Sequence, residues 1–468
     1  MVFSSMTFIW VFLPILLIVY FLVKDKYKNY VLLIFSLIFY AWGEPKYIIL
    51  MIISIMMNYI FGLGIDRFKK KRNKLIILIF SLLANLGLLG YFKYYNFFAE
   101  NVNHLLGKGT LQVRDVVLPI GISFYTFQIL SYVIDVYRKD IKVQKNIFKL
   151  ALYISFFPQL IAGPIVKYHD IEKQLGERKE SVDLFVSGIK RFVYGLGKKV
   201  IIANSLALVA DTIFEADVLA ISTGIAWLGS ICYSLQIYFD FSGYSDMAIG
   251  LGKMFGFHFM ENFDLPYISA SITEFWRRWH ISLSTWFKEY IYIPLGGNRK
   301  GRIRTYINLW IVFLVTGIWH GAAWNFVFWG LFHGFFIFIE RIGFKKILDR
   351  FQILGHIYTL LVADIAWVFF RAEGLKNGFK FVKRMFTYHP EYKINLLDIM
   401  NRKTVVILIL AVLMAGIIQS IIKKVDKKEK LKNVYQIFME PIVLICILGI
   451  SIMMLVSDTY NPFIYFRF

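Results

Sequence analysis

The stretch GIWHGAAWNFVFWGLFHG, Gly317 to Gly334, is apolar enough to lie in a membrane, yet it contains two histidines, His320 and His333. An ionisable side chain buried at such depth is costly, so each imidazole is a functional candidate by default. In one continuous helix the two rings would point to nearly opposite sides, about 220° apart, because each residue turns the helix by about 100°. Rings placed in that way cannot hold one metal ion as an i, i+4 pair does. The spacing therefore predicts separate roles for the two histidines.

His320 is the stronger catalytic candidate. Trp319 precedes it and Trp324 follows one turn later, and the three small residues between His320 and Trp324 let a ligand or a neighbouring helix approach closely. A neutral histidine in a dry aromatic site can accept a proton from a hydroxyl, which is the role of a general base. His333 is instead expected to hold helices together through a hydrogen bond.

The composition is that of an all-α polytopic membrane protein. Of the 468 residues, 58% are hydrophobic and only 18% are charged, whereas a soluble domain has about 25% charged residues. Several apolar blocks approach the roughly 20 residues that a spanning helix needs. Hydropathy predicts roughly ten to twelve such segments, with about 11 as the central value. Some of them are expected to be broken or re-entrant. The longest blocks are Phe8 to Val23, Ile48 to Ile65, Leu75 to Leu89, Val116 to Val136, Val405 to Ile422 and Pro441 to Val456.

The formal net charge of +22 is explained by membrane topology and argues against nucleic-acid binding. Lysines and arginines gather in short runs between apolar blocks, whereas opposite connections, such as WGEPK at Trp42 to Lys46, are poor in positive charge. Cytoplasmic loops carry such an excess, so the pattern places the N-terminus outside. The basic runs are Lys24 to Lys28, Arg67 to Lys74, Tyr137 to Lys145 and Lys423 to Lys430.

No linker, low-complexity tract or fixed-period repeat divides the chain, so a single membrane domain is expected over residues 1–468. No basic region precedes Phe8, and the first helix is expected to be retained rather than cleaved as a secretory signal. Cys232 and Cys446 are far apart in apolar surroundings, so they predict neither a disulfide framework nor a metal site.

Residues 256–304 are too charged to cross lipid in one pass and too aromatic for an ordinary solvated loop. A helix is expected there, capped by Ser271 or Thr273 and beginning near Glu274. It would lie in the interface or dip into it as a re-entrant segment on the cytoplasmic side. Its aromatic stripe is formed by Trp276, Trp279, Leu283 and Trp286, which recur at spacings of three and four.

His280 is expected inside this helix, either as an interfacial histidine bonded to a carbonyl or as a polar group that lines a substrate tunnel. Ser284, one turn later, would share its helix face, so a nucleophile pair is a further alternative. Basic residues in and after the helix are candidates for the phosphates of a substrate or for anionic lipid headgroups. They are Arg277, Arg278, Lys288, Arg299 and Lys300.

The two histidine motifs together carry a resemblance to a known family. FWRRWHISLSTWFKEYIYIPLGGNR, Phe275 to Arg299, followed by the stretch from Gly317 to Gly334, resembles the membrane-bound O-acyltransferase family, in particular its bacterial branch that acetylates alginate, peptidoglycan and other extracellular polysaccharides. The likeness extends through most of the chain. Further stretches that carry it are Leu118 to Arg138, Phe156 to Ile165, Tyr238 to Gly256 and Tyr460 to Phe468.

The resemblance implies a fold, a donor and a partner. The family's invariant histidine maps onto His320 and its second functional polar position onto His280. The implied fold is a ring of tilted helices around a central funnel in the bacterial cytoplasmic membrane. The implied donor is a cytoplasmic acyl-CoA, acetyl-CoA in this branch, with no bound cofactor or metal. A periplasmic or extracellular acetyltransferase of the SGNH type would complete transfer to the polysaccharide acceptor.

Two positions remain open in this scheme. Asn325 is expected either to donate a hydrogen bond to the oxyanion that forms from the thioester or to hold helices together through its amide. Trp319 and Trp324 are expected to line the substrate tunnel beside it. Tyr465 in the aromatic tail at residues 460–468 is a candidate acyl relay, since related export systems have terminal tyrosine motifs on the protein or on a small companion membrane peptide. The alternative for Tyr465 is an interfacial aromatic anchor.

Two alternative functions fit parts of the sequence. A D-alanyl exporter for teichoic acid would be another member of the same family, and YIPLGGNR at Tyr292 to Arg299 favours the acetylating branch on resemblance. A secondary transporter would also place polar residues at depth, but it usually has two related halves with paired broken helices, which the sequence lacks.

Overall fold

The computed structural model describes residues 1–388, 396–425, 435–457, 460–461 and 464, and the regular elements in these residues are helical. Two compact units are formed, Met1–Phe192 with Met247–Met260 and Val193–Asp246 with Glu261–Phe468. Because α10 (Val182–Gly197) and α12 (Thr223–Met254) extend past a unit boundary, each contributes to both.

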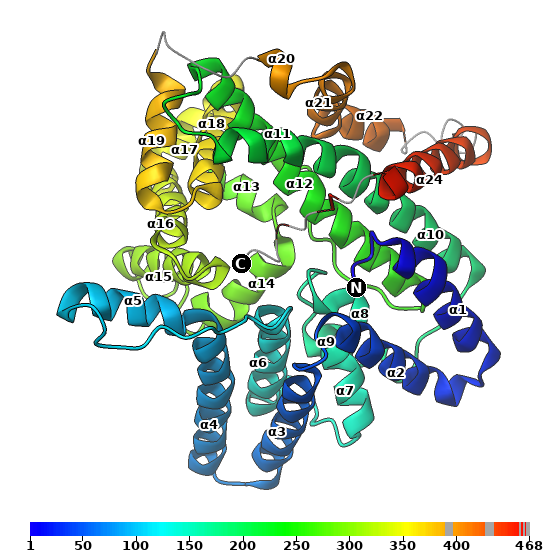
Figure 1. Ribbon diagram of the computed structural model, residues 1–468. Helices are drawn as coiled ribbons and strands as arrows, with labels where there is room; N and C mark the ends of the chain where they lie inside the picture. Colours follow the sequence, from blue (N-terminus) through cyan, green and yellow to red (C-terminus); the bar gives the residue numbers. More distant parts are fainter. Residues whose placement is uncertain (389–395, 426–434, 458–459, 462–463, 465–468) are drawn as a thin grey trace. The chain divides into compact units, whose positions relative to one another are not determined.

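In the first unit, α3, α4 and α6 pack together (Figure 1). A buried polar cluster joins α3 to α4: the amides of Asn58 and Asn85 exchange hydrogen bonds of 2.9 and 2.8 Å, and Ser81 donates to Asn58. Such hydrogen bonds between helices hold apolar segments together where lipid provides no hydrophobic driving force. The helices of this unit are α1 (Leu13–Leu22), α2 (Asp25–Gly43), α3 (Ile48–Arg67), α4 (Lys71–Leu89), α5 (Tyr95–Leu106), α6 (Ile122–Arg138), α7 (Ile147–Ser155), α8 (Phe157–Leu160) and α9 (Tyr168–Ile171).

The second unit contains both histidine motifs. Here α16 packs against α15 and α18, and the short helix α13 contacts α16 and α18. Its helices are α11 (Asn204–Glu215), α13 (Ile272–Arg278), α14 (Ile281–Phe287), α15 (Arg302–His320), α16 (Trp324–Ile339), α17 (Lys345–Arg350), α18 (Gln352–Arg371), α19 (Leu375–Phe386), α20 (Leu396–Ile399), α21 (Arg402–Met414), α22 (Ile417–Val425) and α24 (Glu440–Ser457).

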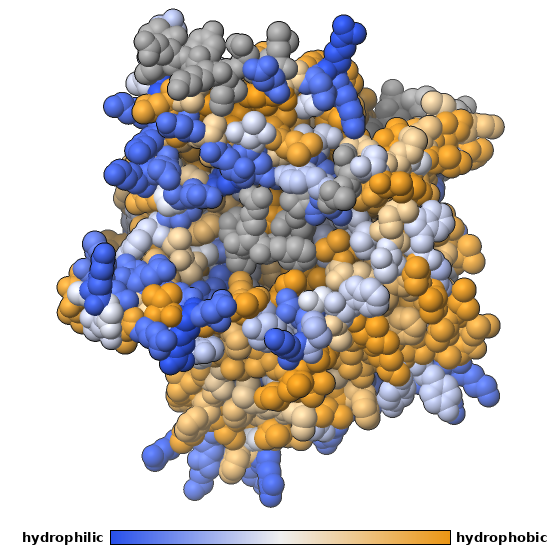
Figure 2. Space-filling view, in the orientation of Figure 1, coloured by the Kyte–Doolittle hydropathy of each residue, from blue (hydrophilic) through white to orange (hydrophobic). Residues whose placement is uncertain are grey.

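Within the described residues, seven helical stretches are long and apolar enough to cross a membrane. Exposed apolar side chains on these helices suit contact with lipid. Figure 2 shows such side chains over α24, where Ile445 is 71% exposed. The loop between α3 and α4, by contrast, is covered by hydrophilic side chains. The chain is therefore a multi-pass membrane protein. The seven stretches are Ile48–Arg67, Lys71–Leu106, Val182–Glu215, Trp324–Arg350, Gln352–Arg371, Arg402–Ile421 and Gln436–Ser457.

The segment from Gly317 to Gly334 is a hairpin of two helices rather than one continuous helix. α15 ends at His320, since Gly321 and Ala323 adopt extended backbone conformations, and α16 begins at Trp324. The two helices touch at glycines. A Cβ atom on Gly330 would lie 2.3 Å from the carbonyl oxygen of Phe313 and 2.9 Å from Cα of Gly317. Only a residue without a side chain permits this approach.

We expect Gly330→Ala to lower the stability of the second unit by about 1–3 kcal/mol, because its methyl group would push α15 away from α16. Thermal unfolding of the purified protein in detergent measures the effect. Gly449→Ala in α24 is the matched control, since a Cβ atom there meets nothing within 4 Å. Equal unfolding temperatures for the two variants would contradict the close contact between the helices.

Candidate active site

His320, the last residue of α15, lies in an aromatic enclosure. The ring is 5% exposed, and its centroid lies 4.9 Å from that of Trp319, 4.9 Å from Trp329 and 5.3 Å from Phe370. Three of its aromatic neighbours therefore come from α15, α16 and α18. This is the dry aromatic setting in which a neutral imidazole serves as a base.

The break in the helix changes the relation between the two histidines of the hairpin. His333 lies one turn after Trp329, and their ring centroids are 5.0 Å apart. The two histidines therefore contact the same tryptophan, and the opposite orientation calculated for a continuous helix does not apply. The predicted hydrogen bond from His333 to another helix is wrong within the described residues, where neither ring nitrogen has a partner.

The interfacial helix expected from Ser271 onward is also broken. Ser271 caps its start as predicted, since its hydroxyl accepts a hydrogen bond from the Glu274 amide at 3.1 Å. Two hydrogen bonds to the segment 262–264 then end α13 at Arg278, because the Arg278 carbonyl accepts from Asp264 N and Ile281 N donates to Asn262 O. The continuous helix was therefore a wrong prediction, although all four residues of its stripe are buried.

His280 occupies the bend between α13 and α14 in the left-handed conformation, with φ of 45°. Its ring is fully buried, and Nδ1 lies 3.1 Å from Oδ1 of Asn262. The same oxygen accepts from the Ser282 hydroxyl at 2.8 Å. An acceptor at this position makes Nδ1 the protonated nitrogen of a neutral ring, so Nε2 keeps its lone pair. Within the described part of the chain, Nε2 has no hydrogen-bond partner.

The bend itself is outside the spanning helices, since α13 and α14 have seven residues each. Burial lowers the pKa of His280 to about 3, so its ring is neutral at physiological pH. The suggested Ser284–His280 side-chain pair does not form, because the Ser284 hydroxyl donates to the Trp276 carbonyl at 3.2 Å. Ser282 is the serine whose hydroxyl lies near the ring, 3.4 Å from Nδ1.

Trp319 lies next to both candidate catalytic histidines. Its ring centroid is 6.4 Å from that of His280 and 4.9 Å from that of His320. The structure thus brings together two residues that are 40 positions apart in sequence. Asn262 was missed by sequence analysis, because nothing in the spacing of a loop residue 18 positions before His280 indicates the contact.

Asn325 and Trp324 lie at the start of α16. The Asn325 amide nitrogen donates to the carbonyls of Phe369 and Ala372, both at 3.2 Å, and so holds the end of α18. These contacts favour the helix-packing alternative for Asn325. Trp324 is 57% exposed.

The candidate phosphate-binding cations fall into different surroundings. Arg278 is neutralised by Glu274 at 2.9 Å and Asp264 at 3.6 Å. Arg277 and Lys288 line one cleft of about 360 Å³ together with Arg341, which sequence analysis had missed. Arg299 and Lys300 lie in the turn before α15.

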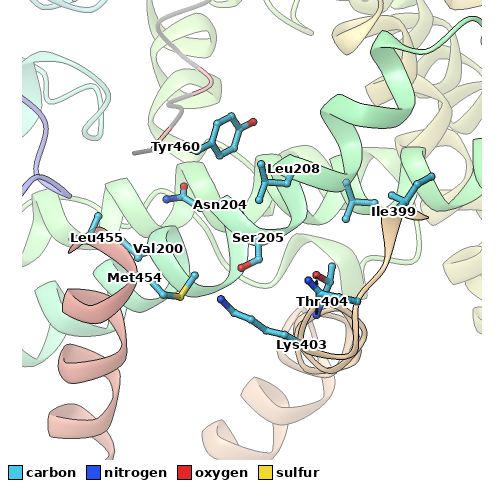
Figure 3. A pocket seen from close by; sticks show the side chains of 12 residues that line it. Val200, Asn204, Ser205, Leu208, Ile399, Lys403, Thr404, Met454, Leu455 and Tyr460 are labelled. Atoms are coloured by element: carbon cyan, nitrogen blue, oxygen red, sulfur yellow. Dashed lines mark hydrogen bonds between the residues drawn. The ribbon is translucent and has the colours of Figure 1, made fainter. Parts of the chain in front are cut away.

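The described part of the tail is anchored within the second unit. The Tyr460 hydroxyl donates to the Asp211 carboxylate, Asn204 donates to the Asn461 side chain at 3.2 Å, and Ile464 N donates to Asp240 at 2.9 Å. Tyr460 and Asn204 also line a pocket of about 290 Å³ beside α21 and α24 (Figure 3). Tyr465, the relay candidate, lies outside the described residues.

Comparisons with known proteins identify the family. Residues 78–371 match the model of the membrane-bound O-acyltransferase family. The chain is 46% identical to the probable alginate O-acetylase of Pseudomonas putida over 83% of this chain and 81% of the relative. It is 39% identical to the peptidoglycan O-acetyltransferase of Helicobacter pylori over 82% of this chain and 80% of the relative. The teichoic acid D-alanyltransferase of Bacillus subtilis is 32% identical over 46% of this chain and 56% of its own length.

The two long matches both cover the bend at His280 and the hairpin at His320 within the segment that defines the family. The match over residues 78–371 and the long similarity to these relatives, in a chain with seven helical stretches able to cross a membrane and two buried histidines next to one tryptophan, show that the chain belongs to the membrane-bound O-acyltransferase family.

Proposed function

We propose that this protein is a membrane O-acetyltransferase that takes an acetyl group from acetyl-CoA on the cytoplasmic side and delivers it across the membrane for O-acetylation of an extracellular or cell-wall polysaccharide. The observation that carries the proposal is that two buried imidazoles, His280 and His320, both lie next to Trp319. Relatives named as alginate O-acetylase and peptidoglycan O-acetyltransferase support the acetyl group and the class of acceptor.

The two histidines have different roles in the proposed reaction. The hydroxyl oxygen of the acceptor forms a bond to the thioester carbonyl carbon while its proton passes to His320, the general base. The C–S bond then breaks, and the proton leaves His320 for the departing thiolate sulfur. His280 offers Nε2, which has no partner among the described residues, as an acceptor for a second donor on the bound substrates and so orients them, while Asn262 fixes the tautomer. The aromatic walls exclude water that would hydrolyse the thioester.

The membrane arrangement follows the charges in the loops. The run Arg67 to Lys74, which includes the loop between α3 and α4, lies in the cytoplasm, and the N-terminus lies outside. About 11 membrane segments and the re-entrant bend at His280 surround a funnel in the bacterial cytoplasmic membrane. On the outer side, an SGNH-type acetyltransferase or the polysaccharide itself takes the acetyl group.

Tyr465 is proposed as a transient acyl carrier between the site and the outer partner. Anchoring of the tail at Tyr460, Asn461 and Ile464 supports this proposal, because it holds the described residues that precede Tyr465 within the second unit. A small companion membrane peptide would be the alternative carrier.

Deletion of the gene is expected to remove acetyl esters from the polysaccharide of the producing cell, and a plasmid copy is expected to restore them. Ester content after mild alkaline release, with acetate and D-alanine quantified separately, measures the result. Loss of D-alanine with acetate unchanged would replace the proposal by the D-alanyl exporter. Failure of the purified protein to cleave acetyl-CoA, together with unchanged esters, would favour a transporter.

A further inference from the structure

The pocket of about 290 Å³ in the second unit lies beside two helices that face lipid (Figure 3). α21 exposes Val406 and α24 exposes Met453, and each helix belongs to a stretch able to cross a membrane. A further wall is formed by the π-helical turn Lys198–Ala203 and the start of α11. A pocket in this position suits a ligand with a hydrocarbon part. Its apolar lining residues are Val200, Leu208, Val209, Ile399, Met454 and Leu455.

Lys403 carries the only charge among the described residues that line this pocket. Its side chain extends across the pocket in the direction of Ser205 and Met454 (Figure 3). Lys403 forms no ion pair with a described residue, and the carboxylate of Asp211, which holds Tyr460, is already paired with Arg371 at 2.6 Å. The pocket therefore favours an anionic group, and the compact charge of a lysine ammonium suits a phosphate.

Asn204 adds a hydrogen-bond acceptor to the wall of the pocket. Its side chain is 7% exposed and its Nδ2 donates to Asn461 at 3.2 Å, whereas Oδ1 is buried and has no partner among the residues described. The neighbouring Ser205 hydroxyl cannot supply the donor, because it already donates to the Ile201 carbonyl at 2.8 Å. Buried polar atoms in native proteins are nearly always paired, so this oxygen indicates a donor on a ligand or a water molecule.

We infer that the pocket binds an anionic glycerophospholipid whose headgroup carries hydroxyls, which is the chemistry of phosphatidylglycerol. Its phosphate would accept a charge-assisted hydrogen bond from Lys403, and a headgroup hydroxyl would donate to Oδ1 of Asn204. The first carbons of an acyl chain would lie against Leu208 and Met454. Phosphatidylethanolamine also has a donor, but its own ammonium compensates the phosphate, so it gains less from an unpaired lysine.

Native mass spectrometry of the purified, delipidated full chain in detergent tests this inference. Three lipids are titrated: phosphatidylglycerol, phosphatidylmethanol, which has the same charge but no headgroup hydroxyl, and phosphatidylethanolamine. We expect phosphatidylglycerol to bind about 10-fold more tightly than either of the others, the effect of one additional satisfied polar group or charge. Glycerophosphoglycerol, which is the same headgroup without acyl chains, should not compete at equal concentration.

Variants assign the binding to the pocket. Lys403→Gln is expected to weaken phosphatidylglycerol binding about 10- to 100-fold. Arg402→Gln is the matched control, since Arg402 is exposed and precedes Lys403 on α21 but does not line the pocket, and its binding should stay within twofold of wild type. Asn204→Leu should remove the preference for phosphatidylglycerol over phosphatidylmethanol. This preference is a ratio within one protein, so a partial loss of folded material does not change it.

Three results would overturn the inference. Equal binding of the three lipids by wild type would show that the pocket selects no headgroup. Equal losses in Lys403→Gln and Arg402→Gln would reduce the effect to general attraction between anionic lipid and the cations at the start of α21. Competition by glycerophosphoglycerol would assign the pocket to a water-soluble phosphate. The measurement needs no acetyl donor, so each of these results leaves the proposed function untouched.

Discussion

Replacing His320 by alanine is expected to eliminate measurable O-acetylation of the polysaccharide in cells that contain equal membrane levels of the protein. General-base catalysis contributes about 10²- to 10⁴-fold to a rate, and the enclosure by Trp319, Trp329 and Phe370 leaves little room for water to substitute as a base. Acetyl ester content of the isolated polymer measures the effect in cells. Thioester cleavage by the purified variant measures it in vitro.

The control for this experiment is another histidine of the same unit. His356 at the start of α18 is half-buried, and its Nδ1 donates to the Ser269 carbonyl at 3.2 Å. It has no part in the aromatic enclosure of His320 or in the proposed mechanism. His356→Gln keeps a donor and should retain acetylation near the wild-type level. Acetylation retained by His320→Ala at the same level would make His320 a structural residue and would remove the base from the mechanism.

Local patterns in the sequence predict the helices and the general region of the site. Long apolar blocks such as Ile48 to Ile65 and Pro441 to Val456 reappear in α3 and α24, because the length of a spanning helix is set by the bilayer. The cap at Ser271 is equally local, since the side chain acts on an amide three residues later. Because these features depend only on residues that are close together in the sequence, they can be predicted from it.

The breaks in the two central helices depend on distant partners. The bend at His280 forms because the segment 262–264 takes backbone hydrogen bonds that a continuous helix would keep, and the periodic stripe through Trp276 and Trp286 contains no sign of this competition. The small residues Gly321–Ala323 were interpreted as room for a ligand or a neighbouring helix within one continuous helix, whereas they form the turn at which α15 and α16 fold back on each other. Periodicity alone cannot distinguish one long helix from two short ones.

The same limitation applies to the residues that sequence analysis missed. Asn262 acts through an oxygen that reaches His280 across 18 positions, and Arg341 joins Arg277 across 64 positions. Among several candidate cations, only their surroundings separate Arg278, which is compensated by carboxylates, from Arg277, which forms no ion pair with a described residue. Charge in a sequence therefore indicates a basic region, but the fold decides which charges remain available to a ligand.

Asn262→Leu is expected to lower the rate of acetyl transfer about 10- to 100-fold, although Asn262 touches no substrate in the proposed mechanism. Leucine is of similar size but cannot accept the Nδ1 proton of His280 at 3.1 Å or the hydroxyl proton of Ser282 at 2.8 Å. The imidazole would then change tautomer or rotate, and a displacement of about 1 Å in a catalytic group can cost about 10²-fold. Initial rates of acetyl transfer with acetyl-CoA measure the loss.

A double-mutant cycle separates this positioning role from a general effect on folding. If Asn262 acts through His280, the variant with both Asn262→Leu and His280→Gln should be no slower than His280→Gln alone, because the second change removes nothing that still functions. Asn262→Asp keeps an acceptor oxygen and should recover part of the rate. Losses that multiply in the double variant, or an aspartate variant as slow as the leucine variant, would show that Asn262 supports the bend between α13 and α14 rather than the histidine that lies in it.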